Sequence, residues 1–128
     1  MSIEKVMMVD DDASIRKVAE ICLSRVGKWQ VEMVDSGTKA LEAATRFKPD
    51  VILLDVMMPG MDGTETFKVL KENEATACTP IIFMTAKVQK QEVESYKQLG
   101  AAGVITKPFD PMTLPDEIRS MLNRQIKP

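Results

Sequence analysis

Residues 50–63 read DVILLDVMMPGMDG, and this stretch decides the fold. The apolar run Val51–Leu54 does not alternate with polar residues, which is typical of a parallel strand that helices cover on both faces. Asp55 follows the run directly, and the proline and glycines after it predict a loop. The stretch therefore indicates a buried strand that ends in a carboxylate beside a loop.

Apolar runs of the same kind recur on both sides of this stretch. They are Val6–Val9 and Ile81–Met84, with weaker strand candidates at Gln30–Val34 and Gly103–Thr106. Helical patterns fill the gaps between Asp12 and Gly27, after Ser36, over about 64–73 and 89–99, and around Leu114–Leu122. Strand and helix thus alternate five times, which predicts one α/β domain with a parallel sheet between two helical layers.

The first helical segment shows the clearest periodicity. Apolar or small residues recur at spacings of three and four, which predicts one buried helix face. These residues are Ile15, Val18, Ala19, Cys22 and Val26. Asp12 is expected to cap the start of this helix, and Gly27 to end it.

Polar residues follow the strands at the end of the sheet where such folds bind ligands. They are Asp10 and Asp11 after the first strand, Asp55 after the third, Thr85 at the end of the fourth and Lys107 after the fifth. Carboxylates about 5 Å apart repel by about 3 kcal/mol per pair at an effective dielectric near 20. A hard divalent cation offsets this repulsion, and magnesium also binds phosphate. The set therefore indicates metal-assisted phosphoryl chemistry, although a single such Asp is more often a helix cap or turn residue.

Composition excludes several classes of function. The 128 residues contain no histidine, which removes Ser-His and Cys-His catalysis and any phosphohistidine on this chain. A net charge of −2 argues against a protein that binds mainly nucleic acid or anionic membranes. The chain has only two cysteines, which form no disulfide framework, and it shows no signal peptide or transmembrane segment. These features favour a cytoplasmic location. No GxxxxGK[ST] motif is present, so a P-loop is excluded.

The chain resembles the receiver domain of two-component response regulators from about Lys5 to Leu122. The matching pieces are Val9–Asp12 with Arg16, Asp50–Gly63, Pro80–Ala86, Gly100–Ala101 and Lys107–Phe109. Each piece is weak alone, but their order and separation together are specific. The resemblance implies a flavodoxin-like (βα)5 doubly wound fold with strand order 2-1-3-4-5. It also implies that residues 1–128 form a single receiver domain without an output domain.

The resemblance assigns roles to the acidic residues. Asp55 would be the phosphoacceptor. Asp10 and Asp11 would hold Mg²⁺, with Mn²⁺ as a possible substitute, and Asp55 and the main-chain carbonyl of Met57 would complete the protein ligands.

The remaining residues would bind the phosphoryl group. Thr85 would donate a hydrogen bond to it, and Lys107 would pair with one of its oxygens. The Lys107–Pro108 bond would be cis. The position that carries an aromatic ring in many relatives is Val104 here, so we expect a different coupling to the output surface, or a domain that mainly relays phosphate.

The implied function is a phosphorylation-switched signalling domain rather than a classical enzyme, although it would catalyse its own phosphorylation and dephosphorylation. Its partners would be a histidine kinase or histidine phosphotransfer protein, and a downstream protein bound by the fourth helix, fifth strand and fifth helix. No contact with nucleic acid or membrane is expected, and the domain would be a monomer or weak dimer. Two alternatives stay open: a constitutive protein-binding module of the same fold, and a phosphotransfer or phosphatase enzyme acting on small molecules.

Overall fold

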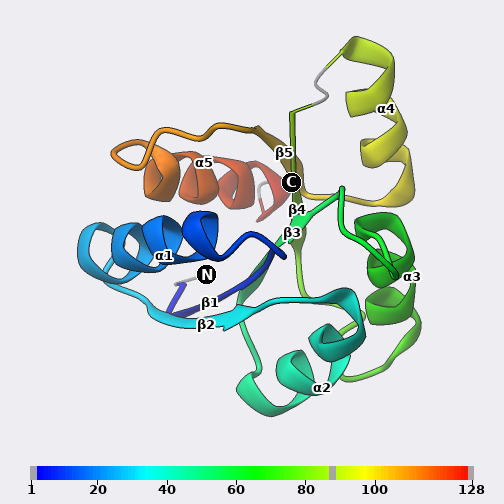
Figure 1. Ribbon diagram of the computed structural model, residues 1–128. Coiled ribbons are helices and arrows are strands. Elements are labelled where there is room, and N and C mark those ends of the chain that lie inside the picture. The colour runs from blue at the N-terminus through cyan, green and yellow to red at the C-terminus, as the bar shows by residue number, and fades with distance from the viewer. Residues whose placement is uncertain (1–2, 87–88, 127–128) are drawn as a thin grey trace.

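A parallel five-stranded sheet forms the centre of the computed structural model, which describes residues 3–86 and 89–126 (Figure 1). The strands are β1 Lys5–Val9, β2 Gln30–Val34, β3 Val51–Asp55, β4 Ile81–Thr85 and β5 Gly103–Thr106. They lie in the order β2-β1-β3-β4-β5, and every pairing is parallel. The flavodoxin-like topology and the predicted strand order are therefore confirmed.

Helices cover both faces of the sheet. They are α1 Ala13–Ile21, η1 Cys22–Val26, α2 Gly37–Phe47, α3 Gly63–Glu72, α4 Lys90–Leu99 and α5 Leu114–Ile126. Helices α1 and α5 lie on one side of the sheet, and α2, α3 and α4 lie on the other (Figure 1). In the part of the chain that the structure describes, no helix has the length and apolar character that a membrane crossing requires.

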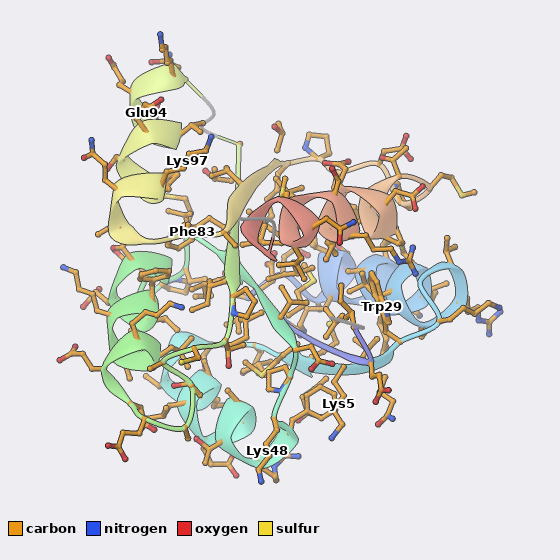
Figure 2. The ribbon with its side chains drawn as sticks, turned by 180° about the vertical axis from the view of Figure 1, so that it is seen from behind. Lys5, Trp29, Lys48, Phe83, Glu94 and Lys97 are labelled. Carbon is orange, nitrogen blue, oxygen red and sulfur yellow. The ribbon has the colours of Figure 1, made fainter. Side chains whose placement is uncertain are left out.

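The core consists of two apolar layers, one on each face of the sheet. Successive side chains of a strand point to opposite faces, so Ile52 packs in one layer and Leu53 in the other. Figure 2 shows Phe83 on the side of α3 and α4, and Trp29 on the side of α1. Burial on both faces explains why the sequences of β1, β3 and β4 are apolar except at one end residue each.

The first helical segment differs from its predicted form. A regular α-helix ends at Ile21 and continues as a π-helix over Cys22–Val26, where the Gly27 N–H donates to the Cys22 carbonyl oxygen at 3.1 Å. The wider turn shifts the buried face by one residue, so Leu23 is fully buried whereas Val26 is 45% exposed. The prediction that Val26 faces the core is therefore wrong, and so is that for Val18, which is 45% exposed within the regular helix before this turn.

Helix caps hold the loops at the carboxyl ends of the strands. The Asp12 carboxylate caps α1, as predicted, by accepting hydrogen bonds from the N–H groups of Ser14 and Ile15. Asp62 and Glu65 form a reciprocal capping box at the start of α3. These caps fix where the loops after β1 and β3 turn, and the polar residues of both loops lie at one edge of the sheet.

Candidate phosphoryl and cation site

Three carboxylates meet at the carboxyl end of the sheet. One oxygen each from Asp10, Asp11 and Asp55 lies within 4.8 Å of the others. Asp10 is fully buried at the end of β1, Asp55 is 3% exposed as the last residue of β3, and Asp11 is exposed. The predicted convergence of the acidic residues is therefore present in the structure.

Lys107 neutralises part of this negative charge. Its Nζ lies 2.8 Å from Asp10 Oδ2 and 3.1 Å from Asp55 Oδ1. The Lys107–Pro108 peptide bond is cis, as expected. The Lys107 N–H donates to the main-chain carbonyl of Thr85 at 2.9 Å, and the Thr85 side chain is buried at the end of β4. The structure thus brings Lys107 to the acidic cluster, and it places Thr85 at the end of the strand that pairs with β3.

Burial and the neighbouring charges shift the pKa values of Asp55 and Lys107. Burial, and then the neighbouring Asp10 carboxylate, raise the pKa of Asp55 to about 6, although Lys107 opposes this rise. Burial alone would lower the pKa of Lys107, but its ion pairs with Asp10 and Asp55 raise it overall. Lys107 is therefore a permanent cation, and Asp55 is largely ionised at neutral pH.

The donor set fits a hard divalent cation. Asp10 Oδ2 is buried and forms no hydrogen bond, so the ion pair with Lys107 is the interaction that the structure records for it. Carboxylate oxygens at this spacing are ligands that Mg²⁺ prefers, and one exposed carboxylate leaves room for water ligands. The Met57 N–H donates to Asp55 Oδ1 at 3.4 Å, which keeps the Met57 main chain beside the site.

The pKa of Asp55 predicts that the metal-free protein becomes more stable as the pH falls from about 7 to about 4. The pKa is about 6 in the folded state against an ordinary value of 3.8, so the folded state binds this proton more tightly than the unfolded state does. The free energy of unfolding should therefore gain up to about 3 kcal/mol from this group as the pH falls from about 7 to about 4.

Asp55→Asn provides the control for this prediction, because the amide does not titrate. Urea denaturation in EDTA should show the variant more stable than the parent at pH 7, with a difference that shrinks toward pH 4. A difference that stays constant with pH would contradict the prediction.

Arg16 contacts the site, although the sequence interpretation named it only within a matching piece and gave it no role. Its Nη1 donates a 2.7 Å hydrogen bond to the main-chain carbonyl of Asp10. The available signal was its place near the start of a helix that Asp12 caps directly after the acidic residues.

Together, these observations describe a small doubly wound α/β domain with an acidic cluster and a lysine at the carboxyl ends of its strands. The chain belongs to the response regulator receiver domain family, whose family model matches residues 6–119. It is thus a receiver domain of the kind found in two-component signal transduction, as the sequence resemblance predicted.

Similar proteins of known family support this assignment. The chain is 36% identical to the DNA-binding response regulator MtrA of Mycolicibacterium paratuberculosis, over 94% of this chain and 52% of that protein. It is 40% identical to the probable transcriptional regulator ycf27 of Guillardia theta, over 97% and 47% respectively. The chain thus spans about half the length of the curated relatives it matches. Because the MtrA proteins are named as DNA-binding, the expectation of no nucleic-acid contact stays a prediction.

Solved structures give the same fold over almost the whole chain. The chemotaxis response regulator CheY4 of Vibrio cholerae superimposes with a TM-score of 0.85 at 34% identity, covering 94% of this chain and 99% of that one. A structure described as the BeF3-activated DrrB receiver domain gives a TM-score of 0.78 at 29% identity, covering 96% and 100%.

Proposed function

We propose that this chain accepts a phosphoryl group on Asp55 from a phosphohistidine of a partner histidine kinase or phosphotransfer protein, and signals through protein contact. The observation that carries the proposal is a buried, ionised Asp55 beside a second buried carboxylate and a lysine. Family membership supports signalling by phosphorylation in general. The donor's histidine complements a chain that has none of its own.

Mg²⁺ is the proposed cofactor, with Mn²⁺ as a substitute. Asp10, Asp11 and Asp55 would hold it, together with the main-chain carbonyl of Met57. When bound, the ion supplies positive charge that neutralises the phosphoryl oxygens.

The residues of the chain have distinct roles in the transfer. An Asp55 carboxylate oxygen attacks phosphorus, so an O–P bond forms while the P–N bond of the donor phosphohistidine breaks. Lys107, already within 3.1 Å of Asp55, pairs with an oxygen of the transferred group. The Thr85 hydroxyl, at the end of the adjacent strand, donates a hydrogen bond to another oxygen. Catalysis here is mainly positioning and charge stabilisation.

A surface beside the site suits a protein donor. An apolar cavity of about 220 Å³ is lined by Ser14, Ile15, Val18, Lys107, Pro108 and Phe109. Val18, one of these lining residues, is 45% exposed. Because the cavity shares Lys107 with the site, a partner that presents phosphohistidine to Asp55 would cover these apolar side chains.

The proposed output surface comprises α4, β5 and α5. Helix α4 buries no residue fully, and Figure 2 shows Glu94 and Lys97 projecting from it. Its Tyr96 is half-buried on Phe83, with ring centroids 5.0 Å apart, and Phe83 pairs in register with Val104 of β5. An aromatic contact from α4 therefore lies next to the valine, and a different coupling at Val104 stays a prediction.

Intact-mass measurement after incubation with acetyl phosphate tests the proposal. We expect a gain of one phosphoryl group with Mg²⁺ and none in EDTA. If hydrolysis removes the adduct too quickly, Mg²⁺-dependent binding of beryllofluoride should still occur, because it mimics the acyl phosphate. A folded chain that shows neither adduct nor beryllofluoride binding would contradict the proposal and favour the constitutive binding module.

A further inference from the structure

Arg16 lies near the start of α1, and its guanidinium group reaches back to the end of β1. It donates its 2.7 Å hydrogen bond to the Asp10 main-chain carbonyl from a half-buried position. The proposed transfer makes no use of this residue. Its partner is not a carboxylate but the peptide unit that joins the two acidic residues of the β1–α1 loop.

Other hydrogen bonds fix the orientation of Asp10 and leave its Oδ2 facing the site. Its N–H donates to the carbonyl of Val34 at 3.0 Å, and its Oδ1 accepts from the Asp12 N–H at 2.9 Å. Its Oδ2 faces Lys107 without a hydrogen bond. Arg16 provides the remaining hydrogen bond, to the carbonyl oxygen. Without Arg16, that carbonyl would lose its recorded partner beside a fully buried residue.

The peptide unit between Asp10 and Asp11 is planar, so its carbonyl direction constrains the bonds to both residues. We infer that Arg16 is a positioning residue for the cation site, holding this peptide so that both carboxylates converge with Asp55. This inference rests on the proposed function, because it assumes a divalent cation at the cluster. Groups that orient metal ligands typically change metal affinity by 10- to 100-fold when removed.

The direction in which Mg²⁺ affinity changes when Arg16 is replaced distinguishes a positioning role from a purely electrostatic one. Arg16 is a cation near an acidic cluster, so removing its charge alone would strengthen Mg²⁺ binding. Loss of positioning would weaken it. Lys17, the next residue on α1, is exposed and carries the same charge, so it offers a matched control.

The experiment measures the dissociation constant for Mg²⁺ by calorimetry in the parent chain and in R16M, R16K and K17M. R16M keeps an unbranched apolar side chain but removes the donor and the charge. We expect about tenfold weaker binding in R16M. R16K, which keeps a charged donor, should recover part of this loss, and K17M should bind as the parent does or slightly more tightly. Thermal midpoints in EDTA report any effect on folding alone.

The outcomes distinguish the inference from the proposed function. A parent chain that binds no Mg²⁺ would overturn both. A parent that binds Mg²⁺ while R16M binds equally or more tightly would overturn the role of Arg16 only. The same holds if R16M merely lowers the midpoint in EDTA, or if R16K binds no more tightly than R16M. Should R16M fail to fold, the comparison of R16K with the parent decides, with weaker binding in R16K expected.

Discussion

Asp55→Asn should abolish the phosphoryl adduct formed with acetyl phosphate and Mg²⁺. The amide is a poor nucleophile toward phosphorus, and of the three clustered carboxylates only Asp55 both pairs with Lys107 and keeps some exposure, 3%. Asp10 is fully buried, and Asp11 is exposed and has no recorded ion pair with Lys107. Intact-mass spectra of the variant should therefore show the unmodified mass under conditions that modify the parent chain.

Asp35→Asn is the matched control for this experiment. Asp35 follows β2 at the same end of the sheet, but it is exposed and forms an ion pair with Lys39 at 3.2 Å rather than with the site. This variant should gain the phosphoryl group as the parent does. An adduct on Asp55→Asn, or peptide mapping that places the group on Asp10 or Asp11, would refute Asp55 as the acceptor.

The sequence predicts the sheet well because burial on both faces leaves a direct mark on the strands. A run such as Val51–Leu54 has to be apolar throughout, and parallel strands need helical crossovers between them. These two constraints give the order of elements. The observed third strand extends the predicted run by one residue, so that Asp55 is its last residue rather than the first residue of the loop, whereas Thr85 ends the fourth strand as predicted.

The first helix was harder to predict because helical periodicity assumes a constant turn. Val26 fits a spacing of three and four, but the π-helical turn before Gly27 moves Leu23 inward and Val26 outward. Nothing in the local apolar pattern distinguishes the two registers. The choice depends on tertiary packing, since Leu23 belongs to the same buried layer as Trp29.

The composition of the site was predictable, but its internal connections were not. The positions of Asp10, Asp55 and Lys107 after strands imply that they meet. Their sequence positions do not show that Lys107 contacts both carboxylates. The contact of Arg16 with a main-chain oxygen is also invisible to residue-type patterns, because any residue supplies a carbonyl. Sequence motifs identify the residues that carry the chemistry, whereas the residues that orient them become visible only in the structure.

Gly63→Ala should destabilise the protein by about 3 kcal/mol, because overpacking against rigid backbone is near the upper end of its usual cost. A Cβ at residue 63 would lie under 2.5 Å from the main-chain oxygen of Asp55 and 2.7 Å from Val56 Cα. These atoms lie at and directly after the end of β3, which presents Asp55, and the Gly63 N–H donates to the Val56 carbonyl at 2.9 Å. The clash would therefore displace Asp55 as well as weaken the fold.

Gly60→Ala, in the loop between β3 and α3, gives the comparison that isolates this clash. Gly60 has a φ of +72°, but an added Cβ would have no heavy atom within 4 Å, so only backbone strain of about 1 kcal/mol is expected. Urea denaturation should therefore rank the parent above Gly60→Ala, and Gly60→Ala above Gly63→Ala. Only Gly63→Ala should also weaken Mg²⁺ binding, because only its added methyl group presses on Asp55. Equal losses of stability in the two variants would show that loop conformation, rather than the close approach of α3 to β3, determines how the acceptor is held.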